Sequence, residues 1–444
     1  MKRFLILLSL AFLSTSSVFA DNLKSKIMPL KDRAEIQNRL FKDRVSTVLP
    51  KIMERTGIDM WIIIAREYNE DPVIRTMLPS TWLNARRRTI LVIYNPGNGK
   101  DLETYAIARY DVGEVFKKMW DPEKEPDQYL ALSKLIKELN PKKIGINQSE
   151  YFAQADGLTA TEYNLFKSSL TRAQFRKVVS AEKLAIGWLE TRSGLEMEYY
   201  PAICNIAHQI IREGFSSNVI SPGKTTTDDV VWWYRERIIE LGLTTWFHPT
   251  VDLQRSDNAE FNFLSAFSKS KDSNVIQRGD LLHVDFGITY LGLNTDTQQH
   301  AYVLKVEESD APAELQNALA VGNQLQDILT EQFVIGRTGN EILLYALNNA
   351  KSVGIKPQIY THPIGYYGHG SGPTIGMWDK QQGVPINGDY PLYKNTAYSI
   401  ELNAKVYIKS WEKEVAIMLE EDAFFDGEKC EYMDPRQTKL ILIK

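Results

Sequence analysis

The sequence predicts a mixed protein of the α/β (α+β) class with two domains. A length of 444 residues is enough for two domains that each have a core. Residues 21–175 alternate between helix-like and strand-like segments, which is the pattern of an α/β domain. From Ser180 the pattern changes to long amphipathic helices and two strand hairpins. We therefore assign residues 176–444 to a second domain.

The first twenty residues have the pattern of a secretory signal peptide. A positively charged start, Met1-Lys2-Arg3, precedes an apolar run at 4–13 and the small-residue end Val18-Phe19-Ala20. The apolar run is too short to span a bilayer, although an uncleaved membrane-anchoring helix is the alternative. We expect residues 1–20 to be removed, the protein to be periplasmic or secreted, and no stable membrane insertion. Cleavage would change the formal charge from −4 to −6.

Charge and cysteine content exclude two classes of function. The chain has no block of basic residues, which argues against a nucleic-acid partner. Its two cysteines, Cys204 and Cys430, lie too far apart in sequence to form a metal knuckle. An exported protein permits a disulfide between them, and two free thiols are the alternative. Cysteine is therefore not expected to carry the chemistry.

The first domain begins with a predicted helix from Arg33 to Arg55, where apolar residues recur at helical spacing. The nearly continuous apolar run from Ile58 to Ala65 predicts a strand that is covered on both faces. Further strands are predicted at 89–94, 105–108 and 143–146, with a helix at 127–139. The domain has no cluster of metal ligands and no glycine-rich phosphate loop. We expect it to cap a site, to form an oligomer interface, or both.

The second domain opens with three predicted helices, at 183–193, 195–213 and 227–241. A polar stretch at 254–271 is interpreted as an inserted loop. A hairpin is predicted over 281–296, followed by helices at 311–333 and 340–352 and a second long hairpin over 394–425. The two hairpins carry most of the acidic residues that we single out below.

The first hairpin pairs two aspartates. In the strand 281–287, alternate residues face opposite sides, so Asp285 lies on the side away from Val284. A turn centred on Tyr290-Leu291 would place Asp285 directly opposite Asp296, with Cβ atoms roughly 5 Å apart. A buried pair of carboxylates at that separation requires a cation or a shared proton. The alternative is an ordinary hairpin with both acids on a solvated face.

Two more segments extend this pair into a hypothetical metal site. The glycine-rich loop 361–370 carries His362 and His369, two of the six histidines. A tight turn at Ser410-Trp411 would place Glu401 opposite Glu420 in the second hairpin. Two divalent cations are the natural counter-charge for four converging carboxylates. Oxygen-rich ligation with one imidazole suits Mn²⁺, Co²⁺ or Zn²⁺.

These residues resemble the pita-bread metallopeptidases, which comprise methionine aminopeptidase, aminopeptidase P and prolidase, with creatinase as a metal-free relative. The resemblance covers roughly 183–425 and includes the pattern His-x-Ile-Gly-x-x-x-His at 362–369. The preceding region is similar to the N-terminal domain shared by aminopeptidase P, prolidase and creatinase. The resemblance implies a creatinase-like N-terminal domain and a pita-bread catalytic domain. The family's five metal ligands correspond to Asp285, Asp296, His362, Glu401 and Glu420.

The resemblance also implies an activity. It implies two divalent ions per chain, with Mn²⁺ as the first choice of metal. Asp296, Glu401 and Glu420 are the candidates for bridging the two ions. Asp285 would bind one ion and His362 the other. A metal-bridging hydroxide would attack the peptide carbonyl. His369 would hydrogen-bond the substrate or the oxyanion, and Glu401 would carry the proton to the leaving nitrogen. The expected function is cleavage of N-terminal bonds in short peptides, Xaa-Pro bonds among them, by a homodimer or higher homo-oligomer.

Four departures from the family pattern bear on substrate choice. Members that act next to proline carry a histidine before the first aspartate, and none lies between His248 and His283. Met418 stands where an arginine is common, and Gln358 stands where a histidine is common. The run Asp296-Thr297-Gln298-Gln299 replaces Asp-x-Thr-Arg. The alternative function is a non-catalytic binding protein, or a metal-free creatinase-like amidinohydrolase, on the same fold.

Overall fold

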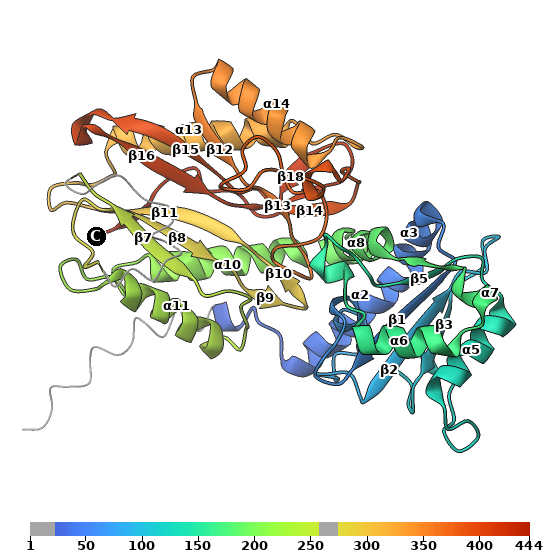
Figure 1. Ribbon diagram of the computed structural model, residues 1–444. Helices are drawn as coiled ribbons and strands as arrows, with labels where there is room; N and C mark the ends of the chain where they lie inside the picture. Colours follow the sequence, from blue (N-terminus) through green and yellow to red (C-terminus); the bar gives the residue numbers. More distant parts are fainter. Residues whose placement is uncertain (1–22, 257–273) are drawn as a thin grey trace, which may run out of the picture.

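The computed structural model describes residues 23–256 and 274–444, which form two bodies joined by long helices (Figure 1). The predicted signal peptide, residues 1–20, lies outside the described residues, as does most of the predicted inserted loop at 254–271. Within the described part of the chain, no helix combines the length and apolar character needed to cross a membrane. Both cysteines are free thiols, which confirms that alternative over the disulfide.

A six-stranded mixed sheet forms the centre of the N-terminal body. Its strand order is β4-β3-β2-β1-β5-β6. The central strand β1 runs antiparallel to β2 and parallel to β5. The strands are β1 (Met60–Arg66), β2 (Arg88–Tyr94), β3 (Glu103–Ile107), β4 (Lys117–Lys118), β5 (Ile144–Ile146) and β6 (Val178–Ser180).

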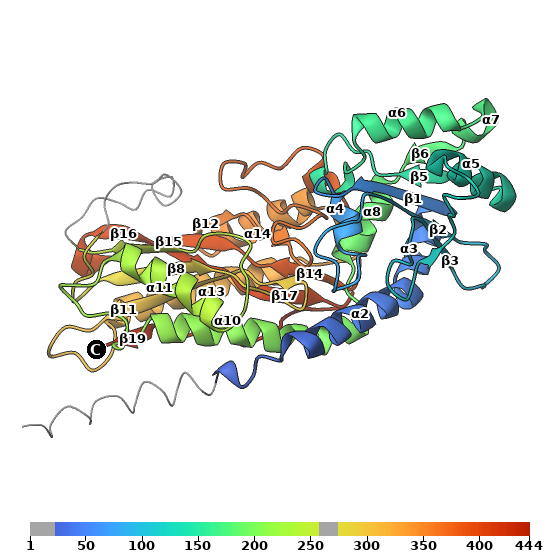
Figure 2. The same cartoon turned by 90° about the horizontal axis from the view of Figure 1, so that it is seen from below.

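Helices cover both faces of this sheet (Figures 1 and 2). Trp61 and Ile63 of β1 pack with α3 (Leu49–Thr56) and α8 (Glu182–Glu190) on one face. Ile62 and Ile64 pack with α5 (Gln128–Leu139) and α6 (Ala160–Ser169) on the other. Every residue of β1 except the last is buried, which confirms the predicted strand covered on both faces. The short helices nearby are α4 (Pro72–Arg75), η1 (Ala153–Ala155) and α7 (Arg172–Phe175).

Two helices predicted as continuous are each divided at a proline. The predicted helix 33–55 is α2 (Leu30–Thr47) followed by α3, and Pro50 lies in the first turn of α3. The predicted helix 195–213 is α9 (Gly194–Met197) followed by α10 (Tyr200–Gly214), with Pro201 in the first turn of α10. Proline has no N–H and clashes with the preceding turn, so it begins a helix but does not continue one.

The C-terminal body places its strands between two pairs of helices (Figures 1 and 2). Helices α10 and α11 (Thr227–Glu240) contribute to the core on one side, and α13 (Ala313–Thr330) and α14 (Gly339–Ser352) to the core on the other. One sheet, in the order β19-β11-β8-β7, consists of β19 (Ile441–Ile443), β11 (Thr297–Val303), β8 (Leu281–Phe286) and β7 (Thr250–Gln254). A second contains β12 (Lys356–Ile359), β15 (Leu402–Ile408) and β16 (Lys413–Leu419). A third contains β13 (His362–Pro363), β14 (Thr396–Ser399), β17 (Asp422–Phe425) and β18 (Cys430–Tyr432).

The register predicted for the first hairpin is wrong by two residues. Its turn is Leu291-Gly292, between β9 (Thr289–Tyr290) and β10 (Leu293–Asn294). Both turn residues have positive φ, 55° and 81°, as a tight hairpin turn requires, and glycine supplies this conformation readily. Moving the turn by one residue moves each cross-strand partner by two, so Asp285 lies opposite Gln298.

The register predicted for the second hairpin is confirmed. Leu402 of β15 pairs with Leu419 of β16, which makes the next residues outward, Glu401 and Glu420, neighbours across the hairpin. The turn is a short helix, η3 (Lys409–Trp411), and a further one, η2 (Asn387–Asp389), lies earlier in the chain. This hairpin therefore carries its two acids to one end of the sheet.

A buried ion network connects the first long helix to the glycine-rich loop. Arg44 of α2 and Arg192 both contact the Glu196 carboxylate, at 2.6 and 2.9 Å, and all three side chains are buried. Both guanidinium groups lie over the ring of Tyr366, at 5.0 and 4.9 Å. Because Tyr366 belongs to the loop between His362 and His369, this network fixes the loop against both bodies.

Candidate metal centre

The predicted ligands come from strand ends that meet where the two hairpins join. The backbone N–H of Gln298 in β11 donates to the carbonyl of Glu420 (3.0 Å), and the N–H of Glu420 donates in return (3.4 Å). This bridge connects the first sheet to the second hairpin. The ligands lie near the end of β8 (Asp285), before β11 (Asp296), at the start of β13 (His362), before β15 (Glu401) and after β16 (Glu420).

Four carboxylates converge at this junction. Asp285, Asp296 and Glu420 each offer an oxygen, and these atoms lie within 4.8 Å of one another. Burial raises the pKa of Asp285, Asp296 and Glu401 well above the usual range for a carboxyl group, and the nearby charge of Glu420 raises it further. The alternative of a hairpin with both aspartates on a solvated face is therefore wrong, because Asp296 is buried and Asp285 is half-buried.

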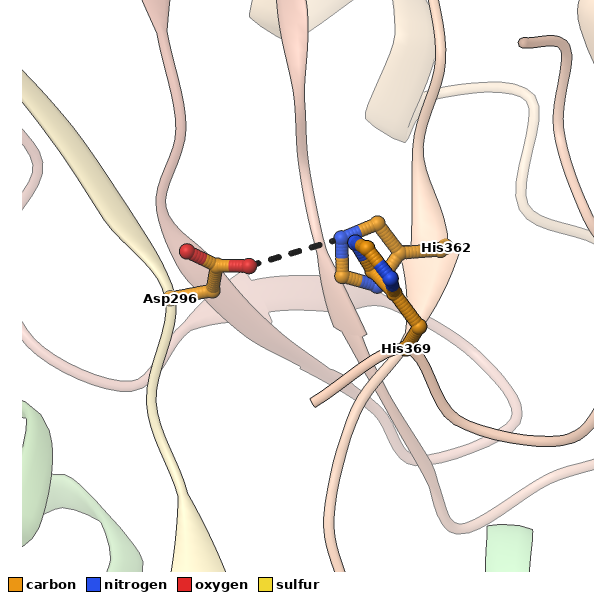
Figure 3. Close-up of side chains that lie close together, drawn as sticks. All are labelled: Asp296, His362 and His369. Atoms are coloured by element: carbon orange, nitrogen blue, oxygen red, sulfur yellow. Dashed lines mark ion pairs between the residues drawn. The ribbon is translucent and has the colours of Figure 1, made fainter. Parts of the chain in front are cut away.

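His362 presents a free ring nitrogen to these acids. Its Nδ1 donates to the carbonyl of Pro363 (3.1 Å), because a carbonyl oxygen can only accept. In a neutral imidazole the lone pair then lies on Nε2. That atom faces oxygens of Glu420, Asp296 and Glu401 at 3.4, 3.6 and 3.9 Å (Figure 3 shows the contact with Asp296). Lone pairs opposed in this way repel unless a cation lies between them.

The donor atoms at the junction fit a divalent metal ion. Asp285 Oδ1, Asp296 Oδ1 and His362 Nε2 are buried and have no hydrogen-bond partner among the described residues. Each unpaired buried polar group costs about 1–3 kcal/mol, and a charged one costs more. Carboxylate oxygens with one imidazole are ligands for Mn²⁺, Co²⁺ or Zn²⁺. The five residues could therefore hold metal, and their assignment as ligands stays a prediction.

Gln298 organises the two glutamates, a role that was not predicted. Its Nε2 donates to Glu401 Oε1 and to Glu420 Oε2, both at 2.6 Å. His283 Nε2 donates to Gln298 Oε1 (3.0 Å). This hydrogen bond fixes the Gln298 amide with its NH₂ group toward the two glutamates. The sequence held a signal for this role: Gln298 is two residues after Asp296, so a strand places both on one face. Ser399 Oγ adds a second donor to Glu420, at 2.5 Å.

A buried imidazole supplies positive charge behind the junction. His208 of α10 contacts Glu421 Oε2 (2.7 Å) and Asp434 Oδ2 (2.6 Å). Burial alone would lower the pKa of His208, but the two acids raise it to about 10, so the ring is cationic at neutral pH. Glu421 directly follows Glu420, which places this charge close to the carboxylates. Sequence reasoning missed His208 because its partners are more than two hundred residues away.

His369 lies at the exposed edge of the centre. Its ring is 4.8 Å from that of His362, in edge-to-face geometry (Figure 3). It is also 5.1 Å from the ring of Trp246, again edge to face. Displacement of water by neighbouring atoms, and secondly His362, lower its pKa to about 4, so it is neutral at pH 7. Trp246 packs so closely beneath Gly368 that a Cβ there would lie 2.2 Å from the indole. Glycine at 368 thus sets the path of the loop.

Three of the residues that depart from the family pattern have hydrogen-bond partners other than the predicted metal ligands. The Met418 N–H donates to His300 Nε2 (3.0 Å), and Gln299 Nε2 donates to Glu421 Oε1 (3.4 Å). Gln358 donates to the carbonyl of Trp378 (2.5 Å). In the part of the chain that the structure describes, none of these three side chains hydrogen-bonds to a predicted ligand. These three departures therefore lie outside the acidic group, whereas Gln298, which stands where the family has threonine, enters it through its hydrogen bonds to Glu401 and Glu420.

Fold and site together define a two-domain α/β protein with a carboxylate- and imidazole-rich centre suited to divalent metal. The profile of metallopeptidase family M24 matches residues 198–425, which include all five predicted ligands. The chain belongs to metallopeptidase family M24. This membership confirms the predicted family and the predicted class of enzyme, a metal-dependent peptidase. No curated protein sequence matches the chain.

Solved structures confirm the predicted fold class over most of the chain. An X-Pro aminopeptidase from Thermotoga maritima has a TM-score of 0.60 at 17% identity, covering 88% of this chain and 99% of that one. An Xaa-Pro dipeptidase from Bacillus anthracis has a TM-score of 0.56 at 17% identity, covering 93% and 100%. A prolidase from Pyrococcus horikoshii has a TM-score of 0.54 at 14% identity, covering 90% and 99%. At these identities the likeness establishes the fold.

Metal binding should release protons from this centre. Because burial and the charge of Glu420 raise the pKa values of Asp285, Asp296 and Glu401 in the folded protein, the metal-free site retains protons above the usual titration range of a carboxyl group, and a cation must displace them. These groups bind more protons folded than unfolded, so the metal-free protein should lose stability as pH rises above about 4, and metal should restore it. Calorimetric Mn²⁺ titration in buffers of different ionisation enthalpy measures the release. Binding without proton release just above the ordinary carboxyl range, at about pH 5, would contradict this electrostatic description.

Replacing Gln298 should weaken metal binding. Gln298→Met keeps the length of the side chain but removes both hydrogen bonds to Glu401 and Glu420. Loss of a group that orients metal ligands typically lowers affinity about 10- to 100-fold. Competition with a fluorescent chelator measures the Mn²⁺ affinity. Gln299→Met is the control, because Gln299 bonds Glu421 instead, and equal losses in both variants would contradict the role of Gln298.

Proposed function

We propose that this protein is an exported peptidase that uses two divalent ions, Mn²⁺ first, to release N-terminal residues from short peptides, with Xaa-Pro bonds among its targets. The observation that carries the proposal is the set of buried atoms without partners, Asp285 Oδ1, Asp296 Oδ1 and His362 Nε2, in a chain of family M24. The candidate donors form three overlapping groups, and two ions are proposed because two of these groups share Glu420: Asp285 and Asp296 lie with it in one, and His362 and Glu401 in the other. The third group combines Asp296 and His362 with His369.

Different observations support the substrate and the location. The similar solved structures are described as an X-Pro aminopeptidase, an Xaa-Pro dipeptidase and a prolidase, which motivates the choice of Xaa-Pro bonds. The charged start Met1-Lys2-Arg3 and the apolar run after it motivate export. Mass spectrometry of the mature N-terminus in the producing cells tests export directly. Light scattering of the purified protein tests the homo-oligomer that we also propose.

The residues of this chain divide the chemical work. Bound divalent ions supply a water of lowered pKa and polarise the peptide carbonyl. His369, neutral and at the exposed edge, can donate its N–H to the substrate carbonyl. Glu401 lies beside His362 and Glu420 in the same group of donors, so its carboxylate can accept a proton and pass it to the leaving nitrogen. Gln298 and Ser399 hold Glu401 and Glu420 in orientation by the hydrogen bonds described above.

The metal-free alternatives fit this arrangement less well. A binding protein or a creatinase-like amidinohydrolase would need protein groups to satisfy the buried acids. Gln298 and Ser399 satisfy part of this demand, but Asp285 Oδ1 and Asp296 Oδ1 have no donor among the described residues. Repulsion between these carboxylates is therefore compensated only in part by the protein.

Purified protein loaded with Mn²⁺ should release N-terminal residues from a panel of short peptides that differ at the second position. Asp296→Asn and His362→Ala each remove a donor from the buried group. Because both donors are needed to retain the ions, each substitution should lower kcat/KM by at least about a thousandfold, equivalent to about 4 kcal/mol. Mass spectrometry of the products measures the release.

Asp228→Asn is the matched control, because Asp228 is an exposed acid in the first turn of α11. Its activity should equal that of the unmodified protein. Faster cleavage of peptides with proline at the second position supports the Xaa-Pro assignment, and equal rates would contradict that part alone. Metal-loaded protein that cleaves no peptide in the panel, or full activity in Asp296→Asn, would contradict the peptidase proposal.

A further inference from the structure

The N-terminal body contains a cavity whose chemistry differs from that of the acidic centre. It has a volume of about 1060 Å³ and lies where β1 and β3 end and β2 begins. Its charged lining residues are Arg66, Glu67, Arg86, Arg87, Arg88 and Arg109. None of the five predicted metal ligands borders it. Five arginines against one acid make the cavity a focus of positive potential.

Only part of this positive charge is neutralised by the protein. The buried Glu162 pairs with both Arg88 (2.6 Å) and Arg66 (3.4 Å), and Glu67 pairs with Arg87 (3.4 Å). Among the residues that the structure describes, no carboxylate lies within 4.0 Å of the guanidinium of Arg86 or Arg109. These two arginines are the charges that an anion could neutralise.

Aromatic rings hold these two guanidinium groups in place. Arg86 lies over Trp82 at 4.6 Å and over Tyr110 at 5.7 Å, and Arg109 lies over Trp120 at 5.7 Å. Stacking on a ring occupies the face of a guanidinium and leaves its N–H edge available. An edge fixed in this way can donate two parallel hydrogen bonds to an oxyanion, and little side-chain entropy is lost on binding.

The backbone beside the cavity is held in an uncommon conformation. Tyr68 and Arg87 both have positive φ, 68° and 54°, although neither is glycine. A hydrogen bond from the Glu67 N–H to the Arg87 carbonyl (2.6 Å) connects the two segments. Such residues store backbone strain and cluster at functional sites. Here both strained positions border the same cavity.

We propose that this cavity binds a multivalent phosphate, as an inorganic polyphosphate or a phosphate ester. Arginine is the side chain best matched to phosphate geometry, because its planar fork contacts two oxygens at once. The cavity lies at the upper end of the size range of small-molecule sites, which is about 300–1,000 Å³. The exposed ring of Tyr68 offers a surface for a planar group on an ester. This site is independent of the proposed peptidase activity.

Calorimetric titration of the full-length, metal-loaded protein with pyrophosphate, ATP and adenosine tests the proposal. Pyrophosphate and ATP should bind, with affinity that falls as salt is raised, and adenosine should not. Tighter binding of ATP than of pyrophosphate identifies an organic ester as the ligand class, and equal affinity identifies the inorganic anion. Adenosine binding as tightly as ATP, or no binding of either phosphate, would overturn the proposal.

Paired substitutions place the anion. The double variant Arg86→Gln with Arg109→Gln should raise the Kd for pyrophosphate about tenfold or more, because two charged donors are lost. The double variant Arg86→Lys with Arg109→Lys keeps the charge but loses the planar fork of the guanidinium group. Its Kd should therefore lie between those of the unmodified protein and the glutamine variant. Arg172→Gln, an exposed arginine outside the cavity, should leave the Kd unchanged. Unchanged binding in the glutamine variant, folded by circular dichroism, would place the anion elsewhere and overturn the assignment.

Discussion

The mutual repulsion of four acidic side chains is the constraint on which the architecture of the C-terminal body depends. Asp296 and Glu420 are buried at the junction of two hairpins, and their neighbours Asp285 and Glu401 are half-buried. The surrounding structure supplies part of the compensation, through the neutral amide of Gln298 and the cationic imidazole of His208 behind the junction. Two buried oxygens, Asp285 Oδ1 and Asp296 Oδ1, still have no hydrogen-bond partner among the described residues. The site is thus prepared for positive charge from outside the protein.

The sequence predicted most of this centre because each step of the prediction used only the residues of one strand or one hairpin. Strand alternation and a predicted turn at Ser410-Trp411 were enough to pair Glu401 with Glu420. The same reasoning misplaced the first turn, because the left-handed conformation of Leu291 cannot be read from a leucine. Asp285 and Asp296 still lie close together, since Asp296 is two residues from Gln298, the cross-strand partner of Asp285. The backbone bridge between Gln298 and Glu420 brings the second hairpin to them. Pro50 and Pro201, which divide the two helices predicted as continuous, are visible in the sequence, and each lies in the first turn of a new helix.

Contacts between distant segments could not be predicted in this way. The orientation of Glu401 and Glu420 by Gln298 depends on strands from another sheet. The positive charge on His208 depends on two acids more than two hundred residues away. The arginine cavity has the same origin, because three separate segments near residues 66, 87 and 109 meet only when the N-terminal sheet forms. That domain was expected only to cap a site or to support an interface. Its sheet therefore has a chemistry that no single stretch of sequence reveals.

The direct test of the central claim is anomalous diffraction from crystals grown with Mn²⁺, recorded above and below the manganese edge. The account predicts two anomalous peaks among the side chains that would hold the ions, Asp285, Asp296, His362, Glu401 and Glu420. The carboxylates should keep the arrangement described above. Crystals in which these oxygens lie apart, with no anomalous peak among them at saturating Mn²⁺, would contradict the account.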